Sequence, residues 1–229
     1  METQAILQTP TPDFPKSLEF YRKLGFKAVN QDDLLTDGKV FVRINQDRFA
    51  RAGIVLYRED WGDVLEKILS LTYFIPTDDG YLLSDASGVW IYLVSGKLET
   101  DLQVQEEGYS VLGNFAGLSL ETVDLAKSAA IYQALGFKLN GGSVESGFAS
   151  FSLSGLTVTL MKPLVCPHLF FNPSMTYFNG KEGNPEIIAK IRTLQIPITE
   201  EITHFNKEGI VDNIIIRDPG GFGFFLFND

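Results

Sequence analysis

The chain of 229 residues repeats part of itself, and this repeat limits the folds that are open to it. The segment 11–27 aligns without a gap on 122–138, a shift of 111 positions, and nine of the seventeen residues are identical. The identical pairs are Thr11/Thr122, Asp13/Asp124, Lys16/Lys127, Ser17/Ser128, Tyr21/Tyr132, Leu24/Leu135, Gly25/Gly136, Phe26/Phe137 and Lys27/Lys138. Because polar positions agree as well as apolar ones, the match exceeds what two unrelated amphipathic helices share. We therefore predict two related halves.

Each copy of the repeat is predicted to fold as a strand, a helix and a second strand. A short apolar run of strand length precedes each copy. Asp13 and Asp124 suit the N-cap position, where a carboxylate accepts the free N–H groups of the first helical turn. Gly25 and Gly136 are expected to end the helices, because glycine adopts the left-handed conformation without strain.

A second helix and a second turn also recur in each half. The segment 63–68 matches 186–191 at a shift of 123, and the turn 85–88 matches 218–221 at a shift of 133. Both turns lead into apolar runs of strand length. The growing shift indicates that the first half is a shortened version of the second.

The extra residues of the second half are predicted to form an additional strand at 156–161 and a longer hairpin through 197–216. We divide the chain into a first domain at 1–97, a polar and acidic linker at 98–109 and a second domain at 110–229. Four successive strand–helix–strand units with short connections predict an α+β fold with mostly antiparallel pairing.

The motifs resemble those of the vicinal oxygen chelate superfamily, which includes glyoxalase I, extradiol dioxygenases and the fosfomycin and bleomycin resistance proteins. The segments 17–26 and 128–137 resemble its first-helix motif. The segment 218–226 resembles its Asp-Pro-Asp-Gly turn and last strand, and 85–93 is a weaker copy. The resemblance implies tandem paired βαβββ modules, that is, two glyoxalase-like domains of two modules each. It also implies that each pair of modules curls around a cleft whose ligand lies against the concave sheet.

In metal-dependent members of this superfamily the cleft holds a divalent ion. A His or Gln of the first strand and a Glu of the last strand bind the ion, together with residues of the middle strands. The two histidines of the chain, His168 and His204, fall in predicted loops. None of the positions in this chain that correspond to those metal ligands is His, Asp or Glu. They are Ile6 and Gly117 in the first strands, Tyr92 and Phe225 in the last strands, and about Gly53, Thr159 and Ser174 in the middle strands. We therefore expect no metal and no cofactor.

An apolar and aromatic cleft floor suits a flat ligand held by stacking and a few polar contacts. The candidate ligand-binding residues are Gln8, Tyr92, Ser119, Glu121 and Phe225, and no catalytic residue is assigned. Alternatively, Tyr92 and Phe225 fill a collapsed cleft as core residues, and Glu121 is a solvated strand end.

Two further polar groups have competing interpretations. Arg43 offers a fork of donors to an anionic ligand, but we favour the interpretation that it is an outward-facing surface arginine. Cys166 lies beside Pro167 and His168, but no third orienting group accompanies the pair. We expect neither group to be catalytic.

The formal net charge of −10, with a pI near 4.7, argues against binding to nucleic acid or to anionic membranes. The single cysteine cannot form an internal disulfide, and no secretory signal or membrane span is visible, so we expect a cytoplasmic protein. The leading hypothesis is metal-independent binding of a small aromatic or cationic molecule, with the better pocket in the second domain. The alternatives are a metal-dependent lyase, isomerase or dioxygenase of the same superfamily, and a non-catalytic interaction scaffold. The chain is expected to be a monomeric pseudo-dimer or a homodimer.

Overall fold

The first half of the chain contains two successive βαβββ modules. The computed structural model describes residues 3–228. The first module consists of β1 (Gln4–Pro10), α1 (Phe14–Lys23), β2 (Lys27–Ala28), β3 (Leu34–Thr36) and β4 (Phe41–Asn45). The second consists of β5 (Gly53–Arg58), α2 (Gly62–Ile68), β6 (Phe74–Thr77), β7 (Gly80–Ser84) and β8 (Trp90–Ser95).

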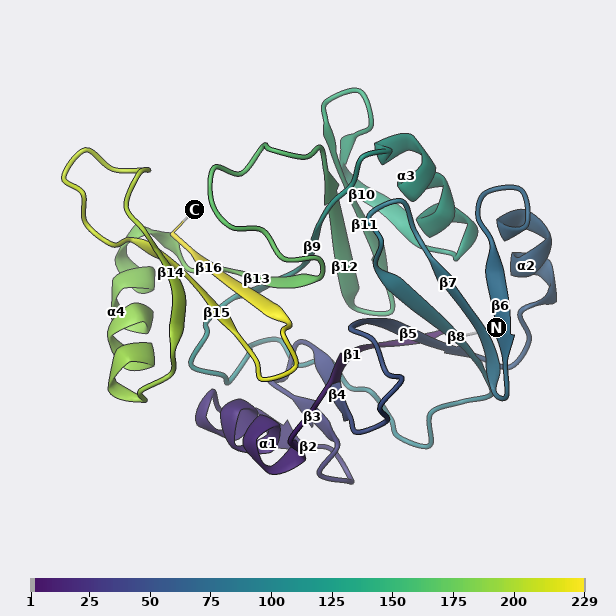
Figure 1. The fold of residues 1–229 in the computed structure, drawn as a ribbon, viewed down its shortest axis with the longest axis horizontal. Coiled ribbons are helices and arrows are strands. Elements are labelled where there is room, and N and C mark those ends of the chain that lie inside the picture. Colours follow the sequence, from purple (N-terminus) through teal and green to yellow (C-terminus); the bar gives the residue numbers. More distant parts are fainter. Residues whose placement is uncertain (1–2, 229) are drawn as a thin grey trace.

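The second half repeats this order, and some of its strands and one of its helices are longer (Figure 1). The third module consists of β9 (Phe115–Glu121), α3 (Leu125–Ala134), β10 (Lys138–Ser143), β11 (Phe148–Leu153) and β12 (Leu156–Met161). The fourth consists of β13 (Ser174–Phe178), α4 (Gly180–Thr193), β14 (Ile198–Ile202), β15 (Asn213–Arg217) and β16 (Gly223–Phe227).

Each half builds one eight-stranded sheet, and the two sheets have the same topology. Their strand orders are β2-β3-β4-β1-β5-β8-β7-β6 and β10-β11-β12-β9-β13-β16-β15-β14. Within each module the first strand pairs in parallel with the last, and all other pairings are antiparallel. The predicted α+β fold of paired βαβββ modules is confirmed. The predicted linker lies in the segment 96–114 between the two sheets.

The prediction of an additional strand at 156–161 is wrong. That segment is β12, which pairs in parallel with β9 just as β4 pairs with β1, so both halves have this strand. The extra residues instead lengthen the first hairpin, because β2 and β3 have two and three residues where β10 and β11 each have six. A longer loop at 162–173 and the long β14–β15 hairpin account for the rest.

The helix ends follow the repeat as predicted. The Asp13 and Asp124 carboxylates accept the backbone N–H groups of Lys16 and Lys127 at 3.2 and 2.9 Å. After each helix the chain turns through a glycine with positive φ, at +92° and +99°. The same local sequence therefore places both helices identically on their sheets.

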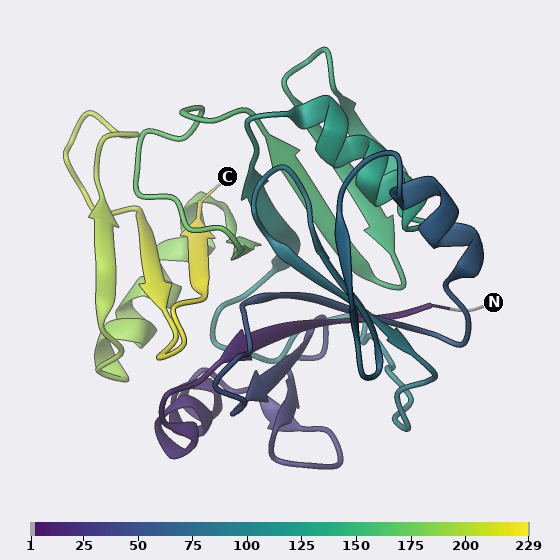
Figure 2. The same ribbon diagram turned by 45° about the vertical axis from the view of Figure 1, so that its right-hand side comes forward.

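The helix-bearing faces of both sheets bury one continuous apolar core, which contains residues of both halves. The last strand shows how the halves meet, because Phe224 of β16 packs against Phe20 and Tyr21 of α1 at ring-centroid distances of 5.7 and 6.0 Å. Figure 2 shows α1 below the β15–β16 hairpin, and α2 beside α3 on the opposite side of the molecule. The first module thus packs on the fourth, and the second packs on the third.

A buried polar network ties the first module to the fourth. Asp218 accepts hydrogen bonds from the Thr9 and Tyr21 hydroxyls at 2.6 and 3.0 Å, and Asp37 accepts one from the Tyr177 hydroxyl at 2.9 Å. Burial raises the pKa of Asp218 and raises the pKa values of both phenols. These polar groups join two halves that share their core, and they fix how the halves pair.

None of the helices in residues 3–228 combines the length and the apolar character that a membrane crossing requires.

Candidate functional site

The concave face of the second sheet brings two of the predicted ligand-binding residues together with a threonine. Ser119 of β9 and Thr176 of β13 have their hydroxyl oxygens 2.6 Å apart, and Thr176 is in register with Phe225 of β16. All three side chains are buried. Two of the predicted ligand-binding residues, Ser119 and Phe225, therefore lie at one point of the sheet, next to a threonine that the sequence did not single out.

The loop 162–173 covers this face of the second sheet. His168 packs against Phe225 and Phe227 with ring-centroid distances of 5.4 and 5.2 Å, and Phe170 packs on Phe225 at 4.9 Å. Closer to β12, the sulfur of Cys166 lies 3.8 Å from that of Met161. The surroundings of Phe225 therefore match the alternative in which it fills a closed cleft, and its ring has no exposed surface for a ligand.

The remaining polar groups of this cleft do not form a catalytic set. Glu121 ends β9 half-buried, and its backbone N–H and C=O are both hydrogen-bonded by the Asn172 side chain. Burial, reinforced by the charge of Glu121, raises the pKa of the Cys166 thiol, so it stays protonated at neutral pH. His204 is exposed in the β14–β15 hairpin loop, far along the chain from these groups.

The side chains at the floor of the second cleft are weak ligands for a transition-metal ion. Zinc, iron and manganese sites use nitrogen, thiolate and carboxylate ligands, whereas Ser119 and Thr176 present neutral hydroxyls and Phe225 presents a phenyl ring. Across residues 3–228, no three His, Cys, Asp or Glu side chains are grouped so that they could share a metal ion.

The concave face of the first sheet holds the other two predicted residues, and they are held by the loop between β4 and β5. Gln8 donates from Nε2 to the Arg51 carbonyl at 3.2 Å and accepts from Asn45 Nδ2 at 2.9 Å. The Tyr92 hydroxyl accepts the Arg51 backbone N–H at 3.1 Å. Both Gln8 and Tyr92 thus have protein partners at the Arg51 end of the sheet.

The linker crosses this concave face and packs on it. Leu98 and Leu102 join a cluster that contains Ile6, Tyr57 and other residues of the face. The Gln4 side chain of β1 anchors the linker twice, accepting the Leu98 backbone N–H at 2.9 Å and donating to a linker carbonyl at 3.1 Å. The polar, acidic segment that the sequence marks as a connection between domains is therefore also the cover of the first cleft.

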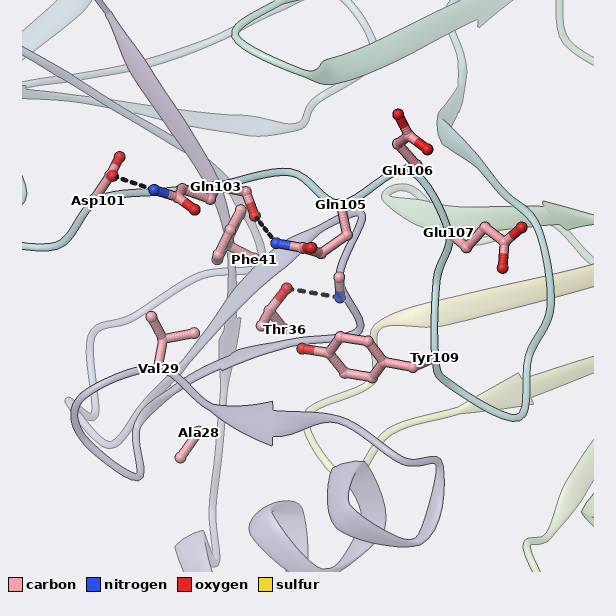
Figure 3. A pocket seen from close by; sticks show the side chains of 11 residues that line it. Ala28, Val29, Thr36, Phe41, Asp101, Gln103, Gln105, Glu106, Glu107 and Tyr109 are labelled. Atoms are coloured by element: carbon pink, nitrogen blue, oxygen red, sulfur yellow. Dashed lines mark hydrogen bonds between the residues drawn. The ribbon is translucent and has the colours of Figure 1, made fainter.

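Three recesses surround the linker. The recess in Figure 3, about 780 Å³, lies between the linker and the edge of the first sheet, and its wall includes Phe41, Thr36 and Tyr109. The Tyr109 ring points from the linker toward Thr36, whereas the Glu106 and Glu107 carboxylates point away from the recess. A second recess, of about 460 Å³, lies between the linker and the β11–β12 turn of the second half. These recesses open on the first sheet, although the sequence favoured the second domain for the better pocket.

The third recess, of about 420 Å³, has an arginine at its base. Arg43 of β4 donates from Nη1 to the Tyr57 hydroxyl, and its Nε lies 3.6 Å from the Asp33 carboxylate. Only a quarter of the Arg43 side chain is exposed. The interpretation of Arg43 as an outward-facing surface residue is wrong, because it is in register with Gln8 and so shares the concave face.

Burial raises the pKa of Tyr57, and the charge of Arg43 only partly opposes that shift. The phenol therefore stays protonated at neutral pH and keeps its O–H as a donor. Leu34, Val94 and Leu98 provide the apolar wall of this recess, which we call the Arg43 recess.

Comparison with solved structures finds this architecture in dioxygenases. The chain aligns with a variant of homoprotocatechuate 2,3-dioxygenase from Brevibacterium fuscum over 100% of its own length and 72% of the other chain, with a TM-score of 0.61 and 15% identity. The fold is that of the vicinal oxygen chelate superfamily. The 2,3-dioxygenase LapB from Pseudomonas sp. KL28 aligns over 98% and 90% of the two chains, with a TM-score of 0.54 and 16% identity. A halotolerant catechol dioxygenase, BphC, gives a TM-score of 0.51 at 14% identity over 97% and 85%.

No protein-family model matches the chain, and no curated protein does. At this level of identity the vicinal oxygen chelate structures establish the fold alone.

Proposed function

We propose that this protein binds a small organic molecule without a metal ion, in the first cleft beneath the linker. The observation that carries the proposal is the set of recesses between the linker and the first sheet, which combine fixed polar groups with an apolar wall. Ligand pockets of about 300–1,000 Å³ typically have this composition. Ile6 and Tyr92, which stand in the first cleft where the resemblance places metal ligands, support binding without a metal.

Thermal unfolding in the presence of a metal chelator tests this proposal. A ligand at a hundred times its Kd adds about 2.7 kcal/mol to the free energy of unfolding. For a chain of this size that corresponds to a rise in Tm of roughly 5–10 °C. We expect such a shift from at least one member of a library of aromatic, cationic, zwitterionic and carbonyl compounds. The absence of any shift across the library contradicts the proposal.

A pair of variants locates the binding. Val94→Trp places a large side chain in the first cleft, because Val94 lines the Arg43 recess. Val123→Trp makes the same change at a position that is 85% exposed on the other half, and it serves as the matched control. We expect Val94→Trp to abolish the shift in Tm and Val123→Trp to retain it.

The competing enzyme hypothesis is a metal-dependent dioxygenase or lyase, and the activities of the dioxygenases that share its fold favour it. Elemental analysis of the purified protein separates the two hypotheses. Stoichiometric iron, manganese, nickel or zinc whose removal abolishes an enzymatic activity would contradict metal-independent binding and support the enzyme hypothesis.

A scaffold role is the second alternative, and the covered concave faces favour it. Loop 162–173 fills one face and carries exposed apolar side chains, with Leu164 92% and Val165 62% exposed. Because the two halves already share one core, we propose that the chain is a monomeric pseudo-dimer. Sedimentation at increasing concentration tests this, and a stable dimer would favour the scaffold role.

A further inference from the structure

We propose that the Arg43 recess binds a small zwitterion with an apolar body, such as a free amino acid with an apolar side chain. This inference rests on the proposed function and names the class of ligand for the first cleft. It follows from the unused donors of Arg43, from the carboxylates on the rim, and from the apolar wall between them.

Arg43, at the base of the recess, has side-chain N–H donors that are available to bind a carboxylate. Within residues 3–228 its only side-chain hydrogen bond runs from Nη1 to Tyr57, and its Nε, which lies 3.6 Å from the Asp33 carboxylate, has no hydrogen-bond partner. In this part of the chain Nη2 also has no hydrogen-bond partner and is not among the buried polar atoms, and Arg43 lines the recess. A carboxylate at this point meets the Nη2 donors and the Tyr57 O–H, an arrangement that charge-assisted hydrogen bonds favour.

The rim of the recess carries the opposite charge. Asp79 and Glu99 line it, while Asp33 is already paired with Arg43 at 3.6 Å and Lys97 with Glu59 at 3.0 Å. An anion without a positive group would meet repulsion from Asp79 and Glu99, and a simple cation would meet repulsion from the arginine. A ligand with both charges satisfies both ends of the recess.

The wall between the two ends selects for an apolar body. Leu34, Val94 and Leu98 belong to the apolar cluster of the concave face, and Leu98 comes from the linker. The linker is held over the recess by Gln4 and by a hydrogen bond of 2.7 Å from Asn30 Nδ2 to the Thr100 hydroxyl. The site is therefore enclosed by both strands and linker, and its volume of about 420 Å³ falls within the usual range for ligand pockets.

Calorimetric titration with phenylalanine and two analogues tests the charge requirement. N-acetylphenylalanine lacks the ammonium group, and phenylalaninamide lacks the carboxylate. We expect phenylalanine to bind and each analogue to bind about tenfold more weakly or worse, because each loses one charge-assisted contact. Equal binding of either analogue overturns the inference.

Two matched pairs of variants test the residues. Arg43→Gln is expected to weaken phenylalanine binding by about tenfold or more, while Arg48→Gln, at an exposed arginine outside the recess, leaves it unchanged. Asp79→Asn is expected to weaken binding, while Asp78→Asn makes the same charge change at an exposed neighbour that does not line the recess. If Arg43→Gln unfolds the protein, the comparison of Asp79→Asn with Asp78→Asn still tests the inference. Binding that is insensitive to Asp79→Asn overturns the inference.

The outcomes also separate this inference from the proposed function. If another compound of the library binds in the first cleft and no amino acid does, the zwitterion inference fails and the proposed function stands. If no compound binds, both fail.

Discussion

The repeat provides a matched pair of tyrosines whose substitution tests the structure at one atom. Tyr21 and Tyr132 are equivalent, both are fully buried, and both pack edge-on against the phenylalanine after their helix, at 5.1 and 5.2 Å. They differ at the hydroxyl. The Tyr21 hydroxyl donates to Asp218 at 3.0 Å, whereas the Tyr132 hydroxyl has no hydrogen-bond partner within residues 3–228.

Replacement of each tyrosine by phenylalanine therefore has different consequences. Tyr21→Phe removes a hydrogen bond to a buried carboxyl group, which lowers the free energy of unfolding by about 1.5–3 kcal/mol. Tyr132→Phe removes a buried hydroxyl without a partner, which is neutral or stabilises by about 1 kcal/mol. Each variant keeps the aromatic ring of its parent residue, so the difference of about 2 kcal/mol or more reports the hydroxyl alone.

Equilibrium unfolding in urea measures this difference. Both variants should keep the m-value of the parent protein, so that the change in midpoint reports stability. A total stability of about 5–15 kcal/mol makes a 2 kcal/mol difference easy to resolve. Equal losses in the two variants would refute the reasoning, because they would show that Tyr132 has a partner equivalent to Asp218.

Three further predictions follow from single positions. Gly220→Ala places a methyl group 1.9 Å from a backbone carbonyl of β1, so we expect a loss of about 1–3 kcal/mol in urea unfolding. Gly62→Ala, whose methyl group would make only ordinary contacts of 3.6 Å or more and which has no positive φ, is expected to be neutral or stabilising. Burial raises the pKa of Asp85 in the folded protein. The protonated Asp85 side chain therefore contributes its full stability below the pKa of the unfolded chain, and this contribution is lost as the pH rises through the folded pKa. We expect Asp85→Asn to stabilise the protein most at neutral pH and to give no gain over the parent protein at about pH 4. The raised pKa of Cys166 predicts slower alkylation than that of a free thiol at neutral pH, and Glu121→Gln should increase the rate; a rate at or above that of free cysteine would contradict the assignment.

Much of the fold was predictable because local rules repeat in the sequence. Asp13 and Asp124 cap helices, and Gly25 and Gly136 end them, through contacts within a few residues. The prediction of an additional strand at 156–161 was wrong because the change in alignment shift between the two halves shows only how many residues are added. It does not show which strands or loops contain them.

The candidate site was less predictable, because its parts are distant in sequence. Ser119 and Phe225 lie close together on one face of the second sheet, but the loop that covers them has no periodic pattern that would indicate it. Arg43 was misjudged because a lone arginine on a short strand does not reveal which face is concave. The acidic composition of 98–109 indicated a linker, and only its anchoring by Gln4 shows that it covers the first cleft.

The sequence by itself determined the number of modules, their order and their helix ends, since these depend on contacts between near neighbours along the chain. Only the tertiary structure decided how the modules pair and which clefts are covered. The hydrogen bond from Tyr21 to Asp218 joins residues 197 positions apart, and nothing in the local sequence of either residue specifies the other. The Arg43 recess likewise exists only because β4, β5 and the linker meet there, since the depth of a cleft is a property of packed surfaces and not of sequence order.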